Sequence, residues 1–233
     1  MSSNPSISRR MTLALAGLIA VASATLVLAI SGAHEGHAES GHSHGNAAVA
    51  ATTTQKQAAF HDAMRKLWED HITWTRLAIV SFAADLPDLP ATEARLLKNQ
   101  KDIGDAIKPY YGKRAGNRLT ALLKEHIVGA VALLQAAKAG DAALIKQRTD
   151  EWYDNGNEIA DFLNKANPHN WPRKTMRKMM KGHLDQTLEE AVDRLGGNYD
   201  ADVRDYDAIH HHILRMADAL SDGIIKQFPG RFR

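Results

Sequence analysis

The sequence predicts an all-α protein, an up-and-down antiparallel bundle of about six helices built from repeated helical hairpins. From about Thr54 to Phe228, apolar residues recur with helical period in every long segment, and no alternating strand pattern appears. Short stretches that contain glycine, proline or aspartate separate these segments. Because short turns join long helices, consecutive helices are expected to run antiparallel.

Residues that end or begin helices set the expected boundaries. The first helix is expected to end where two prolines follow within 85–90, since each proline disfavours helical backbone in the residue before it. Glycine is expected to end the second, third and fifth helices, and Asp141 to cap the fourth. The predicted helices are 54–84, 91–111, 119–139, 141–166, 172–196 and 200–228.

Two motifs recur along this body at intervals of 55 to 57 residues. A histidine stands on the apolar face of the odd-numbered helices, at 71, 126 and 183. On the following helices, the motif Asn99-x-x-Asp102-Ile103 recurs as Asn155-x-x-Glu158-Ile159, and a weaker copy starts at His212. The recurrence predicts three helical hairpins, each with a histidine helix followed by an acid-bearing helix.

Polar residues of these helices are expected to meet inside the bundle. Residues equally far from a shared turn lie at the same height in such a fold, which places six side chains in one middle layer. Buried imidazoles and carboxylates are costly unless they are paired, so the layer should contain partners. The candidate metal-ligating residues are His71, Asp102, His126, Glu158, His183 and His210.

Two interpretations of this layer fit the sequence. Imidazole and carboxylate ligands from facing helices suit a divalent transition metal such as Zn, Cu, Fe or Mn. Alternatively, histidine–carboxylate hydrogen bonds fix the register of the helices without any ligand. A ferritin-like oxidase is not expected, because it needs Glu-x-x-His on two helices and the acids here directly precede His71 and His126.

Residues 1–33 predict a signal peptide or a membrane anchor. Arg9 and Arg10 precede an uncharged apolar run from Met11 to Ser31, which is long enough to span a bilayer. Cleavage after Ala33 and retention as an anchor both fit, and in the second case the membrane is a partner. The positive charge before the run places the remainder outside the cytoplasm, in the periplasm or at the cell surface.

Residues 34–57 predict a disordered, histidine-rich linker before a helical bundle domain at 58–229. The stretch is rich in Gly, Ser, Ala and Thr and lacks apolar periodicity. Closely spaced imidazoles suit Cu, Zn or Ni, so the linker is an accessory metal-capture candidate. Its histidines are His34, His37, His42 and His44.

Composition narrows the function further. The formal net charge is +2 and basic residues do not cluster along the chain, so no nucleic-acid partner is expected. The absence of cysteine excludes disulfides, thiol catalysis and Cys-based metal sites. No nucleophile elbow, phosphate loop or dinucleotide fingerprint occurs, and Ser221 has no obvious partner. Arg76 is expected either to bridge helices or, in preference, to form a surface salt bridge. An enzyme is therefore less expected than a non-enzymatic protein.

Four sets of residues within 67–229 occur together in a known pattern. They are Leu67-Trp68-Glu69-Asp70-His71-x-Thr73-Trp74-Thr75-Arg76, the Asn99 and Asn155 motifs, Trp152-Tyr153 and Gly223-Ile224-Ile225-Lys226-Gln227-Phe228-Pro229. With them, the segment resembles a family of all-helical bacterial proteins that has no established activity. Some members carry a glycosyltransferase label, but this chain shows neither a nucleotide-sugar fold nor an acidic metal motif at a strand–loop junction. The histidines at 210–212 depart from the family, in which acidic residues or glutamine are more familiar.

The leading hypothesis from sequence is an extracytoplasmic helical bundle that binds or handles a transition metal through its inner His/carboxylate layer. The alternative is a non-enzymatic structural or interaction module with a metal-free polar core. The sequence specifies no protein partner.

Overall fold

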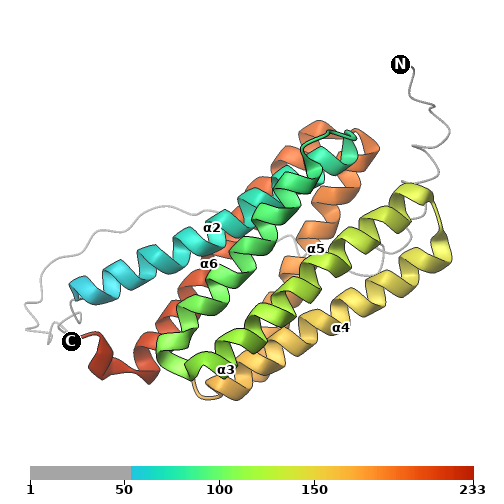
Figure 1. Ribbon diagram of the computed structural model, residues 1–233. Helices are drawn as coiled ribbons and strands as arrows, with labels where there is room; N and C mark the ends of the chain where they lie inside the picture. Colours follow the sequence, from blue (N-terminus) through green and yellow to red (C-terminus); the bar gives the residue numbers. More distant parts are fainter. Residues whose placement is uncertain (1–53) are drawn as a thin grey trace, which may run out of the picture.

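The computed structural model describes residues 54–233. The predicted signal peptide or anchor and the four linker histidines (His34, His37, His42 and His44) lie outside the described residues. The described chain forms five α-helices and a short 3₁₀ turn, with no strand among residues 54–233, so the predicted all-α fold is confirmed (Figure 1). The elements are α2 (Gln55–Ala83), α3 (Leu89–Ala139), α4 (Ala142–Ala166), α5 (Arg173–Gly196), α6 (Tyr199–Gln227) and η1 (Pro229–Arg231).

Helix α3 is two helical arms that reverse direction at Gly112. The backbone there has φ 83° and ψ 166°, a conformation that glycine reaches without steric cost. The arms, 89–111 and 113–139, pack against each other so closely that a Cβ atom on Gly104 would lie 2.6 Å from the carbonyl oxygen of Gly116. The described chain therefore has six antiparallel helical segments, and the predicted second and third helices are the two arms (Figure 1).

Local sequence accounts for the helix ends. The Asp141 side chain accepts a hydrogen bond from the Leu144 amide at 3.0 Å, which confirms its predicted capping role. Gly140 and Gly197 take the left-handed conformation after α3 and α5, with φ of 69° and 78°. Thr54 begins α2 with a capping box, in which the Thr54 hydroxyl accepts from the Gln57 amide and the Gln57 side-chain oxygen accepts from the Thr54 amide.

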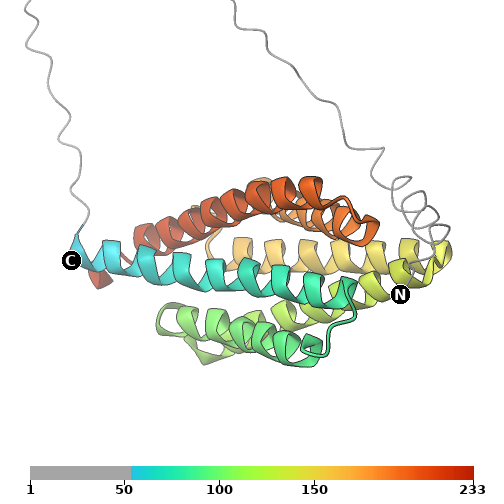
Figure 2. The same ribbon diagram turned by 90° about the horizontal axis from the view of Figure 1, so that it is seen from above.

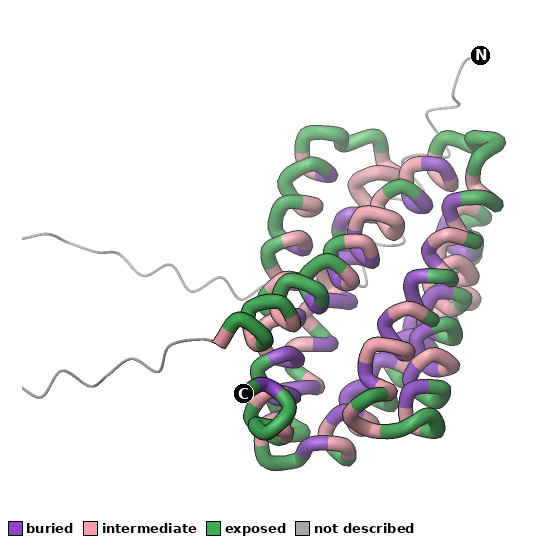
Figure 3. Tube along the Cα trace, turned by 60° about the vertical axis from the view of Figure 1, so that its left-hand side comes forward, coloured by how far each residue is buried: buried purple, intermediate pink, exposed green. Residues whose placement is uncertain are grey.

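The helices close into a ring around one apolar core. Helix α2 packs on both α3 and α6, and the remaining neighbours are α3 with α4, α4 with α5, and α5 with α6. Figure 2 shows the first arm of α3 and helix α6 on opposite sides of α2. Buried positions lie along the inward side of each helix (Figure 3). Ile72, Leu184, Ile213 and Ile224 are fully buried in this core.

Helix α3 also has the length and apolar character of a membrane span, since one 18-residue window has a mean hydropathy of 1.3. In the bundle, 39% of that window is buried against other helices. A core helix passes the same test, so the criterion does not distinguish a span from this packed helix.

The two ends of the bundle differ in what they hold. We call the end at which the described chain starts the entry end; it carries Thr54, the Gly112 reversal, the turn between α4 and α5, and the segment after α6 (Figure 1). The opposite, far end carries the turns at 84–88, 140–141 and 197–198. At the entry end, the Thr54 hydroxyl donates to the Phe232 carbonyl at 2.6 Å, and Phe60, Tyr110 and Phe232 form an aromatic cluster.

A buried histidine layer

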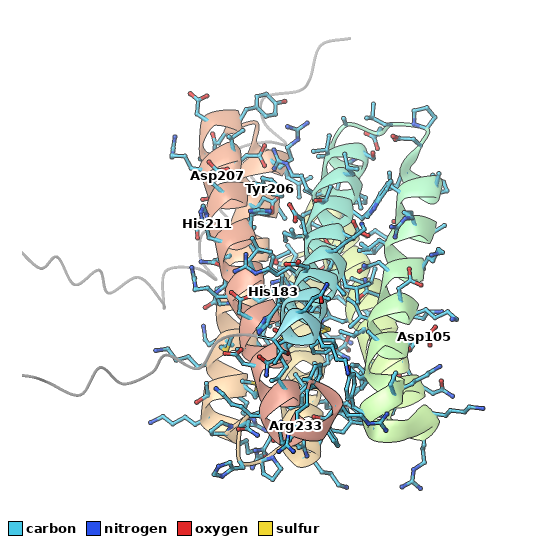
Figure 4. All side chains as sticks on the ribbon, turned by 90° about the vertical axis from the view of Figure 1, so that its left-hand side faces the viewer. Asp105, His183, Tyr206, Asp207, His211 and Arg233 are labelled. Carbon is cyan, nitrogen blue, oxygen red and sulfur yellow. The ribbon has the colours of Figure 1, made fainter. Side chains whose placement is uncertain are left out.

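Three of the predicted layer residues meet in the centre of the bundle. His71 from α2, His126 from the second arm of α3 and His183 from α5 are only 2%, 4% and 4% exposed. The ring centroids of His71 and His183 are 5.6 Å apart, and those of His126 and His183 are 6.1 Å apart. Figure 4 shows His183 inside the bundle. The three imidazoles form what we call the histidine layer.

The predicted carboxylates do not belong to this layer. Asp102 has a side chain that is 33% exposed and accepts a hydrogen bond from Lys98 at 2.9 Å. Glu158 is 62% exposed and lies 3.6 Å from Arg118. Placing them in the core was wrong because the next residues, Ile103 and Ile159, occupy the inward positions, and adjacent helical residues point about 100° apart.

His210 lies outside the layer as well. Its side chain is 29% exposed, and its Nε2 atom is 3.3 Å from a carboxylate oxygen of Glu69 on the outer surface of α2 and α6. The inward positions of α6 are taken by Ile209 and Ile213, which are fully buried. The prediction placed the wrong face of this helix toward the core.

Asn155 fixes the tautomer of His126. The Asn155 amide nitrogen donates to the Leu122 carbonyl at 3.2 Å, so its oxygen is the atom that faces His126 Nδ1 at 2.9 Å. The proton assigned by this network lies on Nδ1 and leaves a lone pair on Nε2. Trp152 stacks on the same ring with centroids 5.1 Å apart and donates from Nε1 to the His126 carbonyl.

His71 has the opposite arrangement. The side-chain nitrogen of Gln100 lies 3.2 Å from His71 Nδ1 and also donates to the Leu96 carbonyl at 2.9 Å. Because that amide nitrogen is a donor, Nδ1 accepts and the ring proton lies on Nε2. The Gln100 oxygen is buried and has no hydrogen-bond partner among residues 54–233.

His183 is the least satisfied member of the layer. Its Nδ1 atom is buried and has no hydrogen-bond partner within the described part of the chain. Its ring packs near the imidazoles of His71 and His126. Neither of these rings carries a negative charge that could stabilise a protonated His183. Burying a polar atom in this way costs about 1–3 kcal/mol of folding free energy.

One hydrogen bond recurs beside each layer histidine. The donors are Asn99 Nδ2, Asn155 Nδ2 and His212 Nε2, at 2.9, 3.2 and 2.9 Å from backbone carbonyls of Leu67, Leu122 and Met179. Donor and acceptor are 32, 33 and 33 residues apart, and each acceptor stands four residues or one helical turn before a layer histidine. In the Asn99 and Asn155 motifs, it is the amides rather than the acids that reach the neighbouring helix.

Burial keeps the layer uncharged. Desolvation lowers the pKa of His71 to about 3 and that of His126 to about 4, and the pKa of His183 also falls well below its usual value. Neutral imidazoles can ligate metals. However, no group of three His, Asp or Glu side chains in residues 54–233 has an arrangement that could hold a metal ion.

A second polar cluster, which the sequence did not predict, lies toward the far end. Arg76 on α2 forms ion pairs with Glu190 on α5, at 3.0 Å, and with Asp202 on α6, and both carboxylates are fully buried. Arg194 adds a contact to Asp202 at 3.3 Å. Burial raises the pKa of Glu190 to about 7 against the opposing effect of Arg76. Of the two expectations for Arg76, the surface salt bridge was wrong and the bridge between helices is confirmed, since the residue links three helices.

Ser221 has a partner that the sequence did not reveal. Its hydroxyl lies 2.7 Å from His61 Nδ1, and His61 Nε2 lies 3.1 Å from Asp222. Although the order resembles a Ser-His-Asp arrangement, Ser221 is fully buried and its hydroxyl also bonds the Ala217 carbonyl at 2.8 Å. A nucleophile needs access to substrate, so these contacts join α2 to α6 and do not form a reactive serine.

Two hollows border residues that contact the histidine layer, and no layer histidine lines either of them. The larger, of about 470 Å³, is open to the surface and is lined by Trp152, Asn155 and charged side chains that include Glu125, Arg148 and Glu158. The other is too small for a substrate. It has a volume of about 50 Å³ and is lined almost wholly by apolar side chains, including Ile79, Ile127 and Trp152. Ligand pockets commonly measure about 300–1,000 Å³. This space fits the irregular packing of helices better than a binding site.

Comparison of the chain with protein-family models, with curated proteins and with solved structures found no match.

Proposed function

We propose that the chain is a non-enzymatic helical module held at the outer face of a membrane, and that its histidine layer fixes how the helices pair. One observation supports this proposal. The three rings are almost completely buried, and their side-chain hydrogen-bond partners among the described residues are the neutral amides of Gln100 and Asn155. An enzyme or an exchangeable metal site needs an open path to its reacting groups.

The layer supports this role through its hydrogen-bond pattern. His71 accepts at Nδ1 from Gln100, whereas His126 donates from Nδ1 to Asn155, so each ring matches its own partner helix. A shift of one helix by a turn would leave several buried donors and acceptors without partners. Such penalties are the means by which buried polar groups select one register in helical assemblies.

The three recurring hydrogen bonds support the interpretation that the hairpins are copies of one unit. Copying a hairpin also copies its histidine and the side chain that bonds the preceding helix, an amide at Asn99 and Asn155 and an imidazole at His212. Duplication would thus account for a layer of three imidazoles without a shared ligand. The location outside the cytoplasm is supported by Arg9 and Arg10 before the apolar run of Met11 to Ser31.

Metal analysis tests the metal-free layer. The four linker histidines are replaced by glutamine in the full chain, so that only the bundle can bind metal, and the protein is purified with and without chelator. We expect no stoichiometric metal and no change in melting temperature with Zn²⁺ or Cu²⁺, because a ligand at 100 times its Kd would stabilise the fold by about 2.7 kcal/mol. One metal ion per chain that is lost in His183→Gln would contradict the proposal.

Metal binding by the layer is the second candidate. Two observations favour it: His126 Nε2 carries a lone pair, and His183 Nδ1 is buried without a partner in the described chain. The Asn155 contact resembles the outer hydrogen bond that orients a metal-bound histidine. Three neutral imidazoles would suit Zn, Cu, Fe or Mn, although rotation of the rings would be needed.

The linker histidines need a separate test. Comparing metal content between the chain with and without His34, His37, His42 and His44 measures capture by the linker alone. Metal that disappears with these four residues supports the accessory role and leaves the core interpretation unchanged.

A further inference from the structure

Charge is distributed unequally along the axis of the bundle. The entry end, taken as 54–63, 103–121, 158–181 and 219–233, contains 14 Lys and Arg residues and 5 Asp and Glu residues. The far end, taken as 75–98, 131–151 and 188–208, contains 8 Lys and Arg residues and 13 Asp and Glu residues. The antiparallel fold brings each set of ranges to one end (Figure 1).

Many cations of the entry end are exposed and lack ion-pair partners. Arg173 and Arg177 share Asp161, and Lys181 pairs with Asp185. Eight others are exposed and form no ion pair with a described Asp or Glu within 4.0 Å. These are Lys56, Lys113, Arg114, Lys165, Lys174, Lys178, Arg231 and Arg233. Cations that attract no internal carboxylate remain available to an external anion.

A groove adds shape to this charge. It lies between α4 and α5 and is lined by Tyr153, Asn157, Lys174, Lys178 and Lys181, among others. Gly156 lies in its wall and packs against Met180 and Leu184 of α5. A phosphate group at this groove would meet the ammonium groups of Lys174 and Lys178 beside a mostly apolar wall that contains Met180 and Leu184.

The chain reaches this end directly from its apolar N-terminal run. Residues 32–53 separate that run from Thr54, and even a fully extended chain of this length spans no more than roughly 75 Å. Thr54 is held at the entry end by its hydrogen bond to Phe232. A membrane that contains the apolar run is therefore joined to the bundle through its basic end.

We propose that the entry end docks on a bilayer that contains anionic phospholipids, with the far end directed away from it. The inference rests on the proposed membrane tether. Lipid phosphates supply the negative charge that the unpaired cations lack, and each basic residue near such a surface strengthens binding about fivefold. The acidic far end would be repelled by the same surface, so the charge asymmetry selects one orientation.

The absence of cysteine allows a direct test of this orientation. Single-cysteine variants Asn117→Cys, at the exposed entry end, and Ala208→Cys, at the exposed far end, are labelled with a fluorophore in the full chain. The protein is placed in nanodiscs of phosphatidylcholine, or of about three parts phosphatidylcholine to one part phosphatidylglycerol, each with a headgroup quencher. We expect quenching at residue 117 in the anionic discs only, and none at 208. Sodium chloride at about 0.5 M should abolish it by screening.

Charge variants identify the cations that act. Replacing Lys113, Lys174, Lys178 and Arg231 by glutamine should weaken docking by about fivefold per residue. The matched control replaces the same number of far-end cations, Lys98, Lys146, Arg148 and Arg204, and should leave docking unchanged. Equal effects of both variants, or equal quenching in neutral discs, would overturn the proposal. Competition by inorganic phosphate at constant ionic strength would also overturn it, by assigning the groove to a soluble anion.

Tether and docking fail in distinguishable ways. A chain that remains in the discs without quenching at residue 117 overturns docking and leaves the tether intact. A chain that leaves the discs overturns the tether, and docking is then tested by sedimentation with vesicles. Pelleting with anionic but not neutral vesicles would still support docking. Absence of such pelleting would overturn docking as well.

Discussion

His183 contributes a buried Nδ1 atom that has no partner among residues 54–233, whereas Nδ1 of His126 is hydrogen-bonded to Asn155 at 2.9 Å. Replacing His183 by leucine should leave the free energy of unfolding unchanged at pH 7 or raise it by about 1–2 kcal/mol, since an unsatisfied polar atom is removed. His126→Leu should lower it by about 1–3 kcal/mol, because Asn155 loses its donor. Urea denaturation of both variants measures the difference. A greater loss for His183→Leu would indicate a ligand at that ring.

The layer also predicts acid sensitivity. Above about pH 6.5 its three histidines are neutral in both the folded and the unfolded chain. As the pH falls from 6.5 toward 4, the unfolded chain binds protons that the folded chain refuses, since burial lowers the folded pKa of His71 to about 3 and of His126 to about 4. Stability contributed by neutral histidines is therefore lost over this range.

Buried acids act in the opposite direction over nearly the same range. The pKa of Glu190 is raised to about 7 and that of Asp205 to about 6, so these groups favour the folded chain as the pH falls. The difference between the native chain and a triple His71→Leu, His126→Leu, His183→Leu variant isolates the layer. We expect the melting temperature of the native chain to fall more steeply between pH 6.5 and 4.5; parallel curves would contradict this.

At this scale, the sequence predicted the burial of His71, His126 and His183, but it wrongly added His210 to them and did not show what the buried rings contact. Their position on apolar faces identified them, because a helix turns by about 100° per residue and the face is set by many leucines and isoleucines. Asp102 directly precedes the buried Ile103, and one residue of helix turns a side chain by about 100°. The prediction therefore put Asp102 on the wrong face of its helix. The sequence does not identify Asn155 and Gln100 as hydrogen-bond partners of these histidines, because a neutral amide carries no charge pattern that points to a buried imidazole.

Among the elements, the reversal of α3 depends on a close approach of its arms. A Cβ on Gly104 would collide with the Thr120 side chain and lie 2.6 Å from the Gly116 oxygen. Gly104→Ala should therefore lower the free energy of unfolding by about 1–3 kcal/mol, despite the better helix propensity of alanine. Gly230→Ala, where an added Cβ meets nothing within 4 Å, is the matched control. Equal stability of the two variants in chemical denaturation would disprove the close contact.

Arg76 joins three helices, and its loss should be severe. Arg76→Met leaves Glu190 and Asp202 buried without their main countercharge, which is expected to cost about 3–5 kcal/mol. Arg65→Met removes an exposed pair with Asp218 and should cost no more than about 1 kcal/mol. Thermal and urea unfolding at pH 7 compare the two. A small effect at Arg76 would show that the cluster relaxes or takes up protons without cost.

Helix boundaries were predictable because they depend on local chemistry. Asp141, Gly140 and Gly197 act where they stand, and no distant residue is needed to interpret them. The second arm of α3 begins at 113, whereas the sequence predicted a start at 119. The residues just after Gly112 are mainly polar and carry little apolar periodicity, so nothing in the sequence indicates that they are helical. The burial of Arg76 was not predictable in this way, since it depends on acids from two other helices.

The whole molecule has a property that its composition conceals. A net charge of +2 gives no reason to expect a nucleic-acid partner. The fold nevertheless alternates the direction of each helical segment, so basic segments separated by many residues meet at one end and acidic segments at the other. Overall balance and strong local imbalance are therefore compatible, and only the topology distinguishes them.

The hydrogen bond from Thr54 to Phe232 has a topological consequence, because it joins the first and last described segments of a closed ring. A ring of this kind can be opened elsewhere. A circular permutant of residues 54–233, with a short Gly/Ser link between the old ends and new ends between Gly140 and Asp141, should keep its helical content and a cooperative melting transition by circular dichroism. Loss of that transition would mean that folding must begin at α2. If the permutant folds, the order of the hairpins along the chain reflects how the sequence arose and is not a requirement of folding. The packed ring can then form from more than one starting point of the polypeptide.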